Sequence, residues 1–141
     1  MSWLLDGNVI VALLIDTHPH YQRATSWFGT VMDPVFTCSV TEGTFLRLHM
    51  QMAADRSSTA AWQSLADFQR NPQHHFIDDG YSYAQVATKG LLGHKQVTDA
   101  WLAQLARRHG TKLATLDGGL IEMHADVGFL IPELAISAPQ S

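Results

Sequence analysis

The start of the chain constrains the fold more than any other stretch. Residues 4–10 read Leu-Leu-Asp-Gly-Asn-Val-Ile, so that two apolar residues lead into an acid, a turn-forming pair and further apolar residues. This pattern predicts a buried strand that ends at Asp6 and a helix capped by Asn8 over residues 9–15. We expect the strand to be central in a parallel sheet, with Asp6 at its C-terminal end, where open α/β sheets place ligands.

Strand-like and helix-like patterns alternate along the rest of the chain, which predicts an α/β fold with helices on both faces of a mainly parallel sheet of about five strands. The further strands are expected at 35–38, 75–77, 112–116 and 127–131. The further helices are expected at 21–28, 39–52, 60–69, 81–92, 97–108 and 121–124, with a loop at 93–95 and no regular structure after Pro132.

Length and composition predict a single globular domain over residues 1–141, because 46% of the residues are hydrophobic and only 16% are charged. The longest apolar run, 9–15, is far shorter than the about 20 residues that a membrane span needs. The N-terminus lacks the basic start of a signal peptide, and the lone Cys38 lies in an apolar stretch typical of a core. We therefore expect a cytoplasmic protein.

Four acids occupy similar strand–helix junctions: Asp6, Glu42, Asp99 and Asp117. In the predicted fold, Asp6 and Asp117 end strands, while Glu42 and Asp99 lie in the first turns of helices. All four junctions are expected at one edge of the sheet. The sequence therefore predicts a cluster of four carboxylates.

Each acid also has a purely structural interpretation. Asp6 and Asp117 could be turn residues, and Asp99 could be favoured by the dipole of its helix. Ser39 and Glu42 have the spacing of a capping box, in which Glu42 would bond the Ser39 amide. For Glu42 and Asp99 taken singly, the structural interpretation is the stronger one.

Taken together, the four acids favour a divalent metal site. Two carboxylates about 5 Å apart repel by about 3 kcal/mol at an effective dielectric of about 20. Hard oxygen ligands with no neighbouring Cys suit Mg²⁺ or Mn²⁺. Net charge is −4, and 13 acids less these four leave nine, which equals the nine Lys and Arg residues, so bound cation would offset the deficit. The chemistry predicted is metal-assisted hydrolysis of a phosphodiester.

Other patterns are weaker. The pairs His18/His20 and His74/His75 lack a second Cys/His motif, so zinc is not expected, and no glycine-rich phosphate loop is found. Arg47 could pair with an acid or contact a phosphate, and we interpret it as a partner in a surface salt bridge. The remaining basic cluster is interpreted as a helix C-cap rather than an RNA contact; it comprises Arg107, Arg108 and Lys112.

The motifs around the four acids together resemble a PIN-domain protein of the VapC-type toxins of bacterial toxin–antitoxin pairs. They are Leu-Leu-Asp6-Gly-Asn8, Thr41-Glu42 before Phe-Leu-Arg47-Leu, Thr98-Asp99-Ala-Trp-Leu and Ala-Thr115-Leu-Asp117. They follow one another in the family's order and span nearly the whole chain.

This resemblance implies an α/β/α sandwich and an Mg²⁺- or Mn²⁺-dependent endoribonuclease that cuts structured RNA, often tRNA or ribosomal RNA. The four acids take the family's catalytic and metal-binding positions, and Asn8 and Thr115 take supporting polar positions. The resemblance also implies a homodimer and a cognate VapB-like antitoxin.

Two other functions remain open from the sequence. A metal-dependent phosphatase or phosphotransfer domain could use a similar sheet, although a second acid two residues after Asp6 would be expected, and this chain has Asn8 there. The other alternative is a catalytically silent PIN-like binding module, against which the four intact acids argue.

Overall fold

The computed structural model describes residues 1–78 and 80–134 and contains a five-stranded parallel sheet in the order β3-β2-β1-β4-β5. The strands are β1 (Trp3–Leu5), β2 (Val35–Cys38), β3 (His74–Ile77), β4 (Lys112–Thr115) and β5 (Gly128–Leu130). The first strand is central, as predicted, so its C-terminal end lies between those of β2 and β4.

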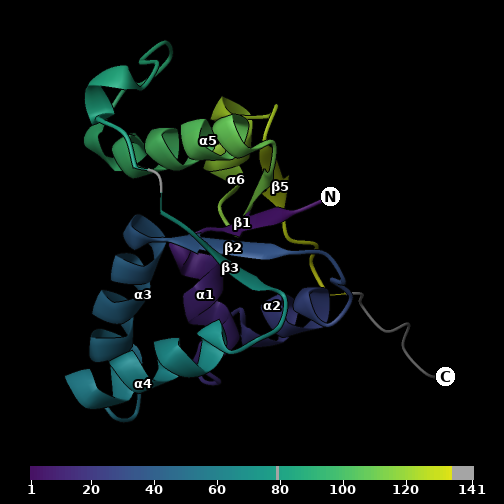
Figure 1. Ribbon diagram of the computed structural model, residues 1–141, viewed down its shortest axis with the longest axis vertical. Helices are drawn as coiled ribbons and strands as arrows, with labels where there is room; N and C mark the ends of the chain where they lie inside the picture. The colour runs from purple at the N-terminus through teal and green to yellow at the C-terminus, as the bar shows by residue number, and fades with distance from the viewer. Residues whose placement is uncertain (79, 135–141) are drawn as a thin grey trace, which may run out of the picture.

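Helices cover both faces of the sheet, which confirms the three-layer α/β/α architecture (Figure 1). On one face lie α1 (Gly7–Leu14), α2 (Tyr21–Phe28), α3 (Ser39–Met52) and α4 (Ser58–Gln69). On the other lie α5 (Val97–His109) and α6 (Gly118–Met123), and two 3-10 turns, η1 (Tyr83–Gln85) and η2 (His94–Gln96), precede α5. In residues 1–78 and 80–134, no helix is both long and apolar enough to span a bilayer.

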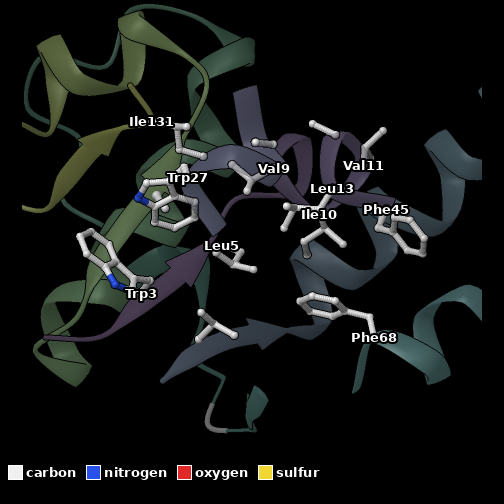
Figure 2. Close-up of a cluster of buried hydrophobic side chains, with 14 of the residues drawn as sticks. Trp3, Leu5, Val9, Ile10, Val11, Leu13, Trp27, Phe45, Phe68 and Ile131 are labelled. Atoms are coloured by element: carbon white, nitrogen blue, oxygen red, sulfur yellow. The ribbon is translucent and has the colours of Figure 1, made fainter. Parts of the chain in front are cut away.

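The two faces of β1 belong to two hydrophobic clusters, because successive side chains of a strand point in opposite directions. Trp3 and Leu5 pack with Val9, Ile10 and other residues of the α1–α4 layer (Figure 2). Leu4 packs on the opposite face, with apolar residues of α5 and β4. A strand covered on both sides is apolar throughout, as the sequence pattern indicated.

A glycine at the start of α1 allows α1 and α3 to approach closely. A Cβ atom added at Gly7 would lie 2.5 Å from Cγ2 and 2.6 Å from Cβ of Thr44. Any larger side chain at this position would force the two helices apart directly beside Asp6. Gly7 is therefore part of the packing that positions the end of β1.

Several sequence-based boundaries were wrong. The helix predicted at 81–92 is absent apart from η1, because these side chains are mostly exposed and Gly90 has a φ of +80°, which an α-helix does not allow. Asn8 does not cap α1; the helix begins at Gly7 and Asp6 is the N-cap residue. Part of the predicted 93–95 loop forms η2.

Three smaller differences concern the end of the chain: β4 stops at Thr115, β5 is shorter than 127–131, and α6 begins at Gly118. The prediction for the tail after Pro132 falls mostly on residues 135–141, outside the described residues.

Candidate active site

The strands of a parallel sheet all end at one edge, and the four predicted acids lie along it. Asp6 directly follows β1, and Asp117 lies two residues beyond β4, the strand paired with β1. Glu42 and Asp99 lie in the first turns of α3 and α5, which both begin at this edge (Figure 1). The backbone arrangement is therefore the predicted one.

Asp6 lies deepest, with only 8% of its surface exposed. The hydroxyl of the fully buried Thr115 donates a hydrogen bond to Asp6 Oδ2 at 2.8 Å, and the same hydroxyl oxygen accepts from the Asp117 amide at 3.0 Å. Burial raises the pKa of Asp6, the bonds from Thr115 and the Gly7 amide oppose that rise, and the charge of Asp117 adds to it. Thr115 thus supports Asp6 and positions the segment that carries Asp117.

Asp99 belongs to the same electrostatic group. Burial of its carboxyl, followed by the charges of Asp6 and Asp117, raises the pKa of Asp99 to about 7. We call Asp6, Asp99 and Asp117 the aspartate cluster. Because the charges of Asp6 and Asp117 add to the rise that burial causes, the carboxylates of this cluster repel one another.

The turn after β4 holds the third member of the cluster in place. Asp117 is exposed, and its Oδ1 accepts a hydrogen bond from the Gly119 amide at 2.9 Å, which caps α6. Asn8 Oδ1 accepts from the Leu116 amide at 3.4 Å. Thr115 therefore bonds both the Asp6 carboxylate and the Asp117 amide, and Asn8 bonds the segment between β4 and Asp117.

Glu42 stands apart from the aspartate cluster. Its Oε2 accepts a hydrogen bond from Thr37 Oγ1 at 2.7 Å and from Gln69 Nε2 at 3.0 Å. Thr37 Oγ1 also lies 2.7 Å from His74 Nε2, and because its single proton goes to Glu42, the histidine nitrogen donates in this contact. Burial lowers the pKa of His74, and the charge of Glu42 opposes that shift.

The capping box expected at Ser39 and Glu42 does not form. Cys38 occupies the N-cap position of α3, and its amide donates to Thr41 Oγ1 at 3.1 Å. Glu42 is therefore not engaged with the helix N-terminus, and its partners come from β2 and α4. Thr37 and Gln69 were missed from the sequence, because nothing in their local patterns connects them to an acid.

Carboxylate oxygens are the donors that Mg²⁺ and Mn²⁺ prefer, and the raised pKa values indicate that a cation would relieve repulsion within the aspartate cluster. Within residues 1–78 and 80–134, however, no three His, Cys, Asp or Glu side chains already stand in a metal-binding arrangement. The donor chemistry fits a divalent cation, and side-chain rotation would be needed to complete its ligand set.

The basic residues lie in two different settings. Arg47 is exposed on α3, donates to Thr44 Oγ1 at 3.3 Å, and has no ion pair among the described residues, so the expected surface salt bridge was wrong. Arg107, by contrast, lies at the end of α5 distant from Asp99 and forms two bonds with Asp126, of 2.6 and 3.0 Å. Arg107 is therefore an ion-pair residue and not a helix cap.

Comparisons with known proteins agree with this geometry. The family model described as "PIN domain" matches residues 3–125. Ribonuclease VapC29 of Mycobacterium tuberculosis is 42% identical over 94% of this chain and 98% of its own length. Among solved structures, M. tuberculosis VapC20, described as a Sarcin-Ricin loop cleaving toxin, has a TM-score of 0.67 at 16% identity over 86% of this chain and 94% of that one.

A further structural neighbour is VapBC2 of Rickettsia felis, bound to a DNA fragment from its promoter, with a TM-score of 0.61 and 16% identity over 90% of this chain and 96% of that one. At such low identity the structural matches establish the fold alone. The family model and the match to VapC29 establish the family as well as the fold, because both cover most of the sequence. The chain therefore belongs to the PIN-domain family, among its VapC-type members.

Proposed function

We propose that this protein is a divalent-metal-dependent endoribonuclease and the toxin of a toxin–antitoxin pair. The observation that carries the proposal is the aspartate cluster, in which burial and mutual repulsion raise the pKa of Asp99 to about 7. The 42% identity to a protein named Ribonuclease VapC29 supports the reaction class. No observation on this chain favours the phosphotransfer alternative.

In the proposed reaction, Asp6, Asp99 and Asp117 would hold Mg²⁺ or Mn²⁺, which would supply an activated water at neutral pH and positive charge beside the phosphodiester. The Thr115 hydroxyl keeps the Asp6 carboxylate oriented. One of the carboxylates helps to take the proton from the attacking water. Glu42 takes part once its carboxylate leaves Thr37 and Gln69 and turns towards the cluster.

The proposal extends to substrate and partners. The expected substrate is structured RNA, either tRNA or ribosomal RNA, and the description of VapC20 as a Sarcin-Ricin loop cleaving toxin supports that class. The expected partners are a cognate VapB-like antitoxin and a second copy of this chain, and the VapBC2 complex among the structural neighbours supports the antitoxin. The expected location is the cytoplasm.

Cleavage of total bacterial RNA by the purified protein tests this function. Reactions would contain Mg²⁺ or Mn²⁺, with an EDTA control and the variant Asp6→Asn. We expect discrete fragments that require both the metal and Asp6, and sequencing of the fragment ends would identify the target. If the folded, antitoxin-free protein cleaves no RNA under these conditions, the silent binding module becomes the better interpretation.

A further inference from the structure

A nuclease must bring a polyanion to the edge of the sheet that carries its active site. The net charge of −4 opposes that approach, so local cations are needed beside the aspartate cluster. Arg47 on α3, and Lys89 and Lys95 in the segment before α5, are exposed and have no acidic partner among residues 1–78 and 80–134. By contrast, Arg23, Arg70 and Arg107 each pair with an acid.

Two of these cations lie in a projecting segment that leads directly into α5. We call residues 80–98 the arm; it contains Lys89, His94 and Lys95 and not one acid. Its end lies one residue before Asp99, and Figure 1 shows it extending beyond the N-terminal end of α5, on the side where α3 also begins. The arm and α3 therefore flank the edge that carries the aspartate cluster.

The root of the arm is fixed by aromatic contacts. The rings of Tyr81 and Trp101 stack with centroids 5.0 Å apart and an interplanar angle of 6°. Trp101 Nε1 donates to the Tyr81 carbonyl at 3.1 Å, and the Tyr81 hydroxyl donates to the Trp101 carbonyl. Arg108 lies over the Tyr81 ring, 4.1 Å from its centroid, and donates to Gln85 at 3.0 Å. These contacts tie the arm to α5 while its tip stays exposed.

The arm also presents an aromatic ring to solvent. Tyr83 is 48% exposed, and its ring centroid lies 5.9 Å from that of Trp101. A ring that is supported on one side and open on the other can stack with a nucleobase, and such stacking tolerates any base. Exposed cations beside an exposed aromatic ring form the combination that binds phosphate and base together.

We propose that the arm and Arg47 form an RNA-binding surface on opposite sides of the aspartate cluster. Lys89, Lys95 and Arg47 contact phosphates, and Tyr83 stacks with a base. This inference rests on the proposed ribonuclease function and adds how the substrate is held. Charge complementarity favours RNA over a protein partner, because the arm carries two exposed lysines and no acid beside an exposed aromatic ring.

Binding of fluorescently labelled bulk bacterial tRNA, measured by anisotropy across a range of salt concentrations, tests the surface. All variants would be made in an Asp99→Asn background, so that the RNA stays intact. The arm variant is Lys89→Glu/Lys95→Glu. The matched control is Arg70→Glu/Lys112→Glu, which makes the same change in net charge close to the N-terminal ends of β3 and β4, at the opposite edge of the sheet.

We expect the arm variant to lose at least about tenfold in affinity at moderate salt. The slope of log affinity against log salt should fall by about 1.5, since each lost phosphate contact contributes about 0.7–0.9. The control should keep the affinity within about twofold. Tyr83→Ala should weaken binding without changing the slope, because stacking releases no counterions. Arg47→Gln should reduce the slope by about 0.7–0.9, the contribution of one phosphate contact.

Three results would contradict the proposed RNA-binding surface. Equal affinities of the arm variant and the control, with wild-type cleavage intact, would reject the surface and leave the proposed function standing. A changed molar mass in light scattering with unchanged tRNA affinity would make the arm a contact between protein chains instead. If the unmodified protein neither cleaves nor binds RNA, the proposed function fails, and the surface fails with it.

Discussion

The two edges of the sheet carry opposite arrangements of charged side chains. At the C-terminal edge, burial of the carboxyl, followed by the charges of Asp6 and Asp117, raises the pKa of Asp99 to about 7. At the N-terminal edge, two hydrogen bonds join Arg107 to Asp126, which raises the pKa of Arg107 and lowers that of Asp126. One edge holds like charges that repel, and the other holds opposite charges that attract.

This difference separates structural charges from functional ones. An exposed pair such as Arg107 and Asp126 contributes little to folding and needs no further partner. Carboxylates crowded in a partly buried site destabilise the fold unless a cation joins them. The proposed metal site would relieve the repulsion at the C-terminal edge, and altering each edge separately should give different results.

The largest expected effect is on catalysis at the repelling edge. Asp99→Asn should reduce RNA cleavage by more than about a hundredfold, since even residues that only support metal ligands commonly cost 10–100-fold. Its free energy of unfolding at pH 8 should be unchanged or higher, because one repelling charge is removed. Asp126→Asn, at the other edge, should cleave normally. Full activity of Asp99→Asn would exclude Asp99 as a metal ligand.

The next effect concerns the support of Asp6. Thr115→Val should lower the free energy of unfolding by about 2–3 kcal/mol, because a buried carboxylate oxygen loses its hydrogen bond. Thr25→Val is a suitable control, since the Thr25 hydroxyl bonds only backbone carbonyls of its own helix. Urea denaturation measures both, and equal losses would mean that Thr115 has no special role at the site.

The raised pKa of Asp99 predicts a pH dependence with a definite sign. Between about pH 4 and pH 7 the folded chain keeps a proton that the unfolded chain has lost, so the Asp99 contribution to stability falls as pH rises. Burial lowers the pKa of His18, His74 and His124, which acts in the opposite direction. The useful quantity is therefore the difference between the unmodified protein and Asp99→Asn.

That difference, measured by urea denaturation from pH 4 to pH 8, should favour Asp99→Asn increasingly as pH rises. Added Mg²⁺ should then stabilise the unmodified protein more than the variant, because it binds the folded cluster. A difference that does not change with pH would mean that Asp99 titrates normally in the folded protein.

The smallest effect is expected at the attracting edge. Arg107→Gln should lower the free energy of unfolding by less than about 1 kcal/mol, as for other exposed ion pairs. The loss should shrink further in high salt, because ions screen exposed charges. Thermal unfolding at two salt concentrations measures both. A loss as large as that of Thr115→Val would remove the contrast between the edges.

Much of the site could be predicted from the sequence, because local signals there agree with the fold. The apolar run before Asp6 predicts a strand covered on both faces, and the helix predicted over 97–108 ends close to its observed C-cap, Gly110, which has a φ of +63°. The positions of all four acids at one edge follow from strands and helices that alternate in a parallel sheet.

The remaining features depend on contacts between distant residues. The direction of the Glu42 carboxylate is set by Gln69, which lies 27 residues away on another helix. The need for glycine at position 7 arises from Thr44 on α3. Residues 81–92 of the arm were predicted to be helical, but most of their side chains are exposed, so no buried face stabilises a helix there.

Titration of Asp99 by carboxyl ¹³C NMR tests the central claim most directly. In protein freed of metal, we predict that Asp99 titrates with a pKa of about 7, and that Asp117→Asn lowers this value. Addition of Mg²⁺ should lower it further, because a bound cation favours the carboxylate. A metal-free Asp99 that titrates near the ordinary value of 3.8, and that does not respond to Mg²⁺, would contradict both the aspartate cluster and the metal site proposed for it.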